Sequence, residues 1–195
     1  MHVANRRVAQ WIIGEGSDFD PVWWLAQELD TVRWEPDKVR HRPKVSCMEV
    51  KELGHLVLYV SNLERSRHFY KDVLGWRAIP AEMPGAALFS SGRTHHELLL
   101  IEVGEGAAPI PRGRRVGMYH FGLKVGTTDD ELRQAIADLR AAGTNVVGMS
   151  DHTVTHSVYI TDPDGNEIEI YIDVQPEVWR EHPEAVLAPI RPLRI

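Results

Sequence analysis

The sequence predicts an α+β fold in which two βαβββ modules form a curved mixed sheet around a cavity, preceded by a helical extension. Three observations support this prediction. A pattern of strand, capped helix and short strands occurs twice along the chain. Both copies place a histidine early in the first strand, His55 and His120. The last strand follows a tight turn and alternates apolar with polar residues, which is typical of a half-buried strand.

The predicted organisation has one domain and an N-terminal segment of different character. A chain of 195 residues has room for one domain and a small additional element. In the first segment, Asp18 or Asp20 can cap a helix that begins at Pro21, and a linker with two prolines follows. The expected bounds are 1–50 for the helical extension and linker, 51–195 for the domain, about 52–104 and 117–173 for its two modules, and 174–195 for the C-terminal tail.

The first module begins with a largely apolar strand over Leu53–Val60. Ser61 and Glu64 have the spacing of a capping box, so we expect a helix to begin there. The helix continues through Leu74 and ends at Gly75, because glycine is favoured just after a helix C-terminus. Short strands are expected over 76–79, 86–90 and 96–103.

The second module repeats this order. A strand covers Met118–Val125, and Thr128 with Glu131 forms a second capping-box pattern. The helix that follows ends at Gly143. Its apolar face consists of Leu132, Ile136 and Leu139. Further strands are expected over 145–149, 157–161 and 167–172.

The last two strands form a predicted hairpin. Its turn is Asp162–Gly165, where Pro163 suits the second turn position and Gly165 accepts a positive φ. After the turn, isoleucines alternate with polar residues. By alternation alone, the face with Glu167 and Glu169 is solvated surface.

Composition excludes several kinds of protein and ligand. Apolar residues make up 43% of the chain and charged residues 26%, with a net charge of −6. This charge without a basic tract argues against nucleic acid and anionic membranes as partners. No apolar run approaches the roughly 20 residues that a membrane span needs. The apolar run near the N-terminus is also shorter than the roughly 7–15 residues of a signal-peptide core, so we expect a cytoplasmic protein. The chain has ten histidines but only one cysteine, Cys47. One thiolate cannot form a metal cage, so a bound metal would use imidazole and carboxylate ligands.

A metal site follows from the repeated modules. Residues two apart in a strand share a face. If the first and last strands face a shared cavity, His55, His120 and Glu169 come together there. Two imidazoles and one carboxylate hold a divalent metal on one side and leave the other side open to substrate. A single strand histidine is more often structural, but the equivalent placement of two histidines favours the joint site.

Four segments resemble the vicinal oxygen chelate superfamily: GHLVLYVSNLERSRHFYKDVLGW, THHELLLIEV, YHFGLKV and DHTVTHSVYITDPDGNEIEIY. Within that superfamily they are most similar to the small type I extradiol (catechol 2,3-) dioxygenases. The resemblance covers about residues 52–180 and leaves residues 1–50 outside. It implies the glyoxalase/dioxygenase-like fold of paired βαβββ modules. We also expect a homo-oligomer, a dimer or higher.

The resemblance implies a role for each matching position. His96 matches an active-site histidine that acts as acid–base and steadies bound oxygen, and Tyr159 matches a hydrogen-bonding tyrosine. The positions that match the iron ligands are His55, His120 and Glu169.

Two positions match the family pattern less closely. His152 resembles a further active-site histidine, but the segment from His156 to Tyr159 is two residues shorter than the family pattern. An exposed loop histidine therefore stays the alternative for His152. Glu167 falls outside the register of the third ligand, so we interpret it as polar surface.

The resemblance also implies a reaction. Fe(II), or alternatively Mn(II), would bind a catechol-type aromatic diol through its two adjacent oxygens, with O2 as co-substrate. The acid–base histidine would move the diol proton at neutral pH, and the ring would open beside the diol.

Three alternatives share the scaffold. A glyoxalase-like lyase would draw a carboxylate ligand from the strand that begins His95-His96-Glu97, where a histidine is the better candidate. A thiol transferase acting on an epoxide antibiotic shares the His-His-Glu set, so the ligands alone do not exclude it. A non-catalytic drug-binding resistance protein would have no need of that set.

Overall fold

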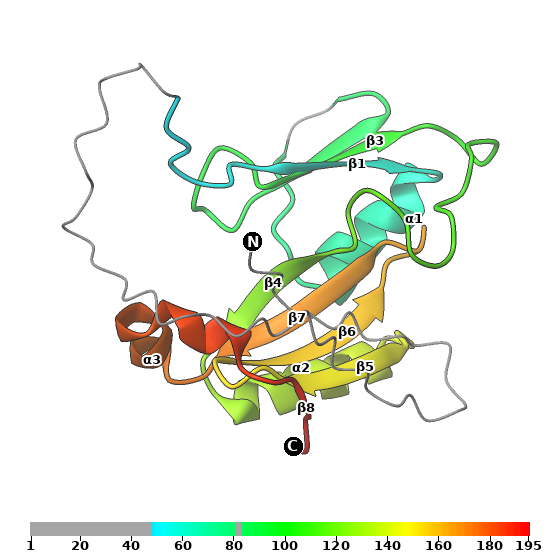
Figure 1. Cartoon of the computed structure of the whole chain (residues 1–195). Helices are drawn as coiled ribbons and strands as arrows, with labels where there is room; N and C mark the ends of the chain where they lie inside the picture. Colours follow the sequence, from blue (N-terminus) through cyan, green and yellow to red (C-terminus); the bar gives the residue numbers. More distant parts are fainter. Residues whose placement is uncertain (1–47, 81–82) are drawn as a thin grey trace, which may run out of the picture. The chain divides into compact units, whose positions relative to one another are not determined.

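The computed structural model describes residues 48–80 and 83–195 (Figure 1). The chain divides into two units, Met1–Lys51 and Glu52–Ile195, and the helices and strands of the described residues belong to the second. The predicted helix beginning at Pro21 and the linker after it lie outside the described residues.

The first module follows the predicted order with one strand fewer. Its elements are β1 (Leu56–Val60), α1 (Leu63–His68), the π-helix η1 (Phe69–Val73), β2 (Ala86–Phe89) and β3 (Leu98–Glu102). Gly75 has a φ of 68° and ends the helical segment, as predicted. The expected strand at 76–79 is a single bridge between Ala78 and Phe89. Pro80 follows it, and proline has no amide hydrogen to extend a ladder.

The predicted capping box of the first helix is wrong. Asn62, not Ser61, is the N-cap of α1, and its side chain accepts a hydrogen bond of 3.0 Å from the amide of Arg65. The Ser61 amide and hydroxyl instead donate to the carboxylate of Asp164, in the second module. The sequence around the helix start allows either Ser61 or Asn62 as the N-cap. Ser61 is instead bonded to Asp164, which is distant in sequence.

The second module is βαβββ, as predicted. Its elements are β4 (His120–Gly126), α2 (Asp129–Ala141), β5 (Val146–Asp151), β6 (Thr155–Thr161) and β7 (Glu167–Asp173). The capping box of Thr128 and Glu131 is present, with both reciprocal hydrogen bonds. Leu132, Ile136 and Leu139 are the buried residues of α2, which confirms the predicted apolar face.

Hydrogen bonding divides the strands into two sheets, where the sequence had suggested one. One sheet has the order β1-β3-β2, and the other has the order β4-β7-β6-β5-β8. In each sheet the first strand of a module pairs in parallel with its last strand, β1 with β3 and β4 with β7. The remaining pairs are antiparallel. This arrangement places the beginning of each first strand beside the beginning of the last one (Figure 1).

The turn between β6 and β7 connects the two modules. Gly165 has a φ of 89°, and its amide donates to the carbonyl of Asp162, so the predicted tight turn is present. The buried carboxylate of Asp162 accepts from Asn166 and from the hydroxyl of Tyr70 in η1, at 2.8 Å. Asp164 accepts from the amide and hydroxyl of Ser61, just before the N-cap of α1. The hairpin therefore holds the first module against the second.

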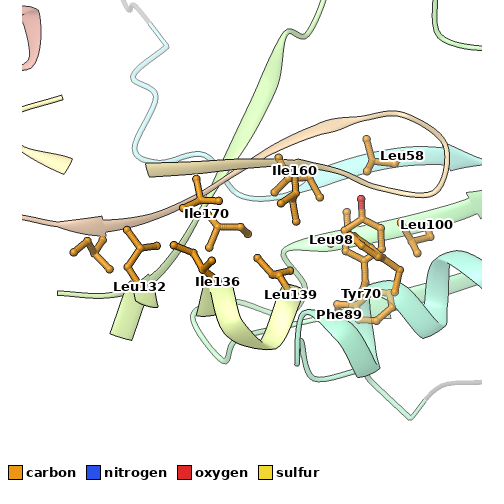
Figure 2. Packing of buried hydrophobic residues seen from close by; sticks show 14 of the residues in the cluster. Leu58, Tyr70, Phe89, Leu98, Leu100, Leu132, Ile136, Leu139, Ile160 and Ile170 are labelled. Carbon is orange, nitrogen blue, oxygen red and sulfur yellow. The ribbon is translucent and has the colours of Figure 1, made fainter. Parts of the chain in front are cut away.

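One apolar core spans both modules. Figure 2 shows Leu58, Leu98 and Leu100 of the first module in the same cluster as Ile160 and Ile170 of the second. The helix α2 supplies its apolar face to this cluster, and Tyr70 and Phe89 pack with their rings 6.1 Å apart. The isoleucine face of β7 is thus buried, and its polar face is left for other contacts.

The C-terminal tail adds short elements beside the second sheet. These are α3 (Pro176–Glu181), the 3-10 helix η2 (Pro183–Leu187) and β8 (Arg191–Pro192), which pairs with β5. Among the described residues, none of the helices has the length and apolar character needed to cross a membrane.

Candidate active site

The polar faces of β4 and β7 bring His120 against Glu169. The parallel register pairs His120 with Glu167 and Gly122 with Glu169, so alternate residues of both strands lie on one face. His120 Nε2 is 3.3 Å from Glu169 Oε2, and the two side chains are 27% and 18% exposed. These residues were predicted to be two of the three metal ligands, and the structure places them in contact.

Gly122 leaves room for this contact. A Cβ at Gly122 would come within 3.1 Å of the Tyr171 ring and 3.7 Å of Glu169 Oε2. A Cβ at this position would therefore crowd the Tyr171 ring, whereas its distance from Glu169 is that of an ordinary contact.

Tyr159 and His152 complete this group. Tyr159 lies directly opposite Glu169 in the antiparallel pair of β6 and β7. Its hydroxyl donates to Glu169 Oε1 at 3.0 Å and lies 2.9 Å from His152 Nε2. The His152 side chain is only 23% exposed, so it is not an exposed loop histidine. The spacing did not settle its position; the hairpin fold brings it here.

The contact between His120 and Glu169 shifts their pKa values in opposite directions. The hydrogen bond to Glu169 raises the pKa of His120 above its usual value, against the opposing effect of burial. Burial alone would raise the pKa of Glu169, but the hydrogen bond and charge of His120, together with the hydrogen bond from Tyr159, outweigh it and lower that pKa. Both shifts favour the charged forms, an imidazolium beside a carboxylate.

The other two members of the group are held neutral. Burial, followed by the charge of Glu169, raises the pKa of Tyr159. Burial lowers the pKa of His152, although Glu169 acts in the opposite direction. A neutral tyrosine and a neutral histidine can each donate or accept a hydrogen bond next to the carboxylate.

A second group, in the first module, contains the other two predicted residues. The rings of His55 and His96 are 4.5 Å apart between centroids, and His95 Nδ1 is 2.6 Å from His96 Nδ1. Partial burial and the neighbouring His95 and His55 lower the pKa of His96. His96 is therefore neutral at pH 7 and available as a base.

The structure does not bring all predicted ligands together. No group of three or more His, Cys, Asp or Glu side chains arranged to hold a metal occurs within 48–80 and 83–195. His120 and Glu169 form a half-site with donor atoms suited to a divalent metal. His55 lies with His96 instead.

Glu97 is occupied elsewhere. Its carboxylate accepts hydrogen bonds from Ser91, Ser90 and the Arg93 guanidinium. These contacts favour the sequence interpretation that this strand does not provide a carboxylate ligand.

The interpretation of Glu167 as polar surface is wrong. Its side chain is 18% exposed, and Glu167 Oε1 lies 3.7 Å from His120 Nδ1. Strand alternation already placed Glu167 and Glu169 on one face. Once Glu169 was assigned to the site, the same period would have placed Glu167 there too.

The fold and the match to known families define the class of this protein. Residues 52–170 match the Glyoxalase/Bleomycin resistance protein/Dioxygenase superfamily, a span that includes every predicted site residue. The chain belongs to this superfamily, which is the one the sequence motifs indicated.

Two curated relatives of the chain are named as dioxygenases. The chain is 33% identical over 139 residues to a catechol-2,3-dioxygenase of Bacillus subtilis (strain 168), covering 71% of this chain and 47% of that protein. It is 31% identical over 121 residues to biphenyl-2,3-diol 1,2-dioxygenase 3 of Rhodococcus globerulus, covering 62% and 63%. The chain thus spans about half to two thirds of the length of these relatives.

A solved structure with a different named activity is also similar. The crystal structure of a lactoylglutathione lyase from Agrobacterium tumefaciens is 25% identical, with a TM-score of 0.50, covering 68% of this chain and 98% of that one. Together with the family match, it confirms the predicted α+β fold class.

Proposed function

We propose that this protein is a metal-dependent extradiol dioxygenase that cleaves a catechol-type aromatic diol with O2. The observation that supports the proposal best is the contact group of His120, Glu169, Tyr159 and His152. This group lies in a chain that is one third identical to a catechol-2,3-dioxygenase over most of its described length.

The ligands we propose are His120 and Glu169, which form the half-site, and His55, the third position that the resemblance implies, which lies with His96 in the first module. The first two are in contact, and their imidazole and carboxylate donors fit a divalent ion. Fe(II) is our first choice and Mn(II) the alternative. When bound, the metal would supply a centre through which the diol and O2 exchange electrons.

We propose a separate role for one residue of each group, His96 in the first module and Tyr159 in the second. His96, neutral at pH 7, takes a proton from a diol hydroxyl so that the diol binds as an anion. Tyr159 is fixed by Glu169 and His152, and its neutral hydroxyl orients a substrate oxygen. The overall reaction adds both atoms of O2 and breaks one ring C–C bond beside the diol.

A glyoxalase-like lyase is the second candidate, because one similar solved structure carries that name. A carboxylate ligand from the first module would favour it. In the described structure Glu97 is bound to Ser91 and Arg93, and His95 and His96 occupy the adjoining positions. The donor set therefore favours the dioxygenase. No contact of the described residues specifically favours the other two alternatives, the thiol transferase and the drug-binding protein.

The test is anaerobic purification, metal analysis and then oxygen uptake with a panel of catechols. We expect bound Fe(II), oxygen consumption and a yellow ring-cleaved product. The His96→Ala variant should keep the metal and lose about 10²–10⁴-fold in turnover, the usual range for lost acid–base catalysis. Bound Fe(II) without oxygen uptake across the panel would contradict the proposal, and thiol-dependent turnover with Mn(II) or Ni(II) would support the lyase or transferase.

Assembly and location stay predictions. We propose a homo-oligomer of two or more copies in the cytoplasm, with a small aromatic diol as the ligand and without nucleic acid or membrane partners. Light scattering of the purified chain measures the number of copies.

A further inference from the structure

The His120 ring lies between two carboxylates, one at each ring nitrogen. Nε2 faces Glu169 Oε2 at 3.3 Å, and Nδ1 faces Glu167 Oε1 at 3.7 Å. The strand register produces this arrangement, because His120 is directly paired with Glu167 and Glu169 is two residues further along β7. One ring thus contacts two acidic side chains. Glu169 belongs to the metal half-site, and Glu167 lies at the other nitrogen of the ring.

The atoms on the Glu167 side are buried without a hydrogen bond. Among the described residues, His120 Nδ1 and Glu167 Oε1 are both inaccessible to solvent and lack a hydrogen-bond partner. A buried donor and a buried acceptor that face each other gain most by pairing, because each has otherwise lost its hydrogen bonds to water without a replacement. Their separation of 3.7 Å is longer than a hydrogen bond but is within reach of a side-chain adjustment.

Tyr119 holds Glu167 in this position. The Tyr119 hydroxyl is hydrogen-bonded to the Glu167 carboxylate, and burial together with that carboxylate raises the pKa of Tyr119 to about 12. Tyr119 directly precedes His120, and their rings are 4.7 Å apart. The carboxylate is therefore fixed from one side by a neutral phenol and faces the imidazole on the other.

We propose that Glu167 is a positioning residue for His120, which accepts a hydrogen bond from Nδ1–H. This bond would fix the tautomer in which Nε2 has a free lone pair, and it would aim Nε2 at the metal position beside Glu169. A carboxylate behind a ligating histidine fixes the ring and increases its basicity, and loss of such a partner costs 10–100-fold in metal affinity. The inference rests on the proposed metal site and concerns a residue outside the predicted ligand set.

The test is a titration of the metal-free protein with Co(II), followed by absorbance, for five forms of the chain. These are wild type, Glu167→Ala, Glu167→Gln, Glu169→Gln and Asp173→Asn. Asp173 is the matched control, because it lies on the same face of β7, is similarly buried and pairs with Lys124 rather than with a histidine. Thermal unfolding of each metal-free variant shows whether it is folded.

We expect Glu167→Ala to weaken Co(II) binding by about 10–100-fold, and Glu167→Gln, which keeps an acceptor oxygen, to weaken it less. Asp173→Asn should bind as wild type does, and Glu169→Gln should lose more affinity than any other variant. Proton NMR of the Co(II) protein provides a second readout. The ring N–H of a bound histidine gives a shifted signal that exchanges slowly with water when it is hydrogen-bonded, and Glu167→Ala should make that exchange fast.

Several outcomes would overturn the inference. Wild-type affinity in Glu167→Ala, or a loss no larger than that of Asp173→Asn, would show that Glu167 does not position His120. A loss equal to that of Glu169→Gln would make Glu167 a direct ligand. If Glu167→Ala does not fold, the test uses Glu167→Gln. An unchanged N–H exchange rate in that variant would show that Glu167 does not position His120. A wild-type chain that binds no Co(II) would overturn the metal site as well, whereas binding without ring cleavage would count against the proposed reaction alone.

Discussion

At the scale of single residues, His120 has the most informative surroundings. Its ring contacts Glu169 on one side and faces Glu167 on the other. The same side chain must be protonated to form the ion pair and deprotonated to bind a metal through Nε2. Folding of the metal-free protein and metal binding therefore depend on pH in opposite directions.

The pKa of His120 is raised, chiefly by the hydrogen bond to Glu169. Its contribution to stability is therefore complete below the unfolded histidine pKa of about 6.5 and is lost as pH rises through the higher folded pKa. Metal affinity should instead fall as pH drops through that folded pKa, by about tenfold per pH unit for one released proton. Co(II) titrations and urea denaturation between about pH 6 and 8 measure the two trends. Parallel trends would contradict this assignment.

At the scale of elements, the two helices show where local sequence is sufficient. In α2, Thr128 and Glu131 satisfy each other's backbone groups within one turn, so the motif could be recognised from four residues. In α1, Ser61 and Asn62 both have side chains suited to an N-cap. Asn62 takes that position because Asp164 engages Ser61.

Asn62→Ala and Thr128→Ala should each cost about 1 kcal/mol of stability, the usual value for loss of an N-cap. Urea denaturation with tryptophan fluorescence measures both. Thr127→Ala is the control. Thr127 donates to Glu131 through its backbone amide, which the substitution keeps. An Asn62→Ala protein as stable as wild type would mean that another group caps α1.

At the scale of the whole described domain, the turn between β6 and β7 sets how the modules meet. Asp164 accepts from the Ser61 amide at 3.2 Å and from the Ser66 hydroxyl at 3.3 Å, and pairs with Arg65. Asp162 binds Tyr70 in the first module. Because Tyr159 and Glu169 lie on the strands that this turn connects, contacts at the turn also affect the placement of the candidate site.

Asp164→Ala should destabilise the protein by about 1–3 kcal/mol, because it leaves partly buried donors of α1 without an acceptor. Guanidinium denaturation gives the value, and Glu177→Ala, at an exposed position of α3, provides the control. A loss within the range of the control would show that the turn does not hold the modules together.

The sequence by itself determined the fold class, the order of most elements and the hairpin that carries Tyr159 and Glu169. These features depend on local signals: periodicity, the Asp162–Gly165 turn and the capping box of α2. The family resemblance pointed to the histidine and glutamate positions that the structure groups.

Only the tertiary structure decided which of these side chains lie together. It placed His152 beside Tyr159, moved Glu167 from expected surface to the His120 ring, and left His55 in a separate group with His96. It also divided the strands into two sheets. Such outcomes depend on register and packing between strands distant in sequence. Alternation gives the face of a strand but does not show what covers that face.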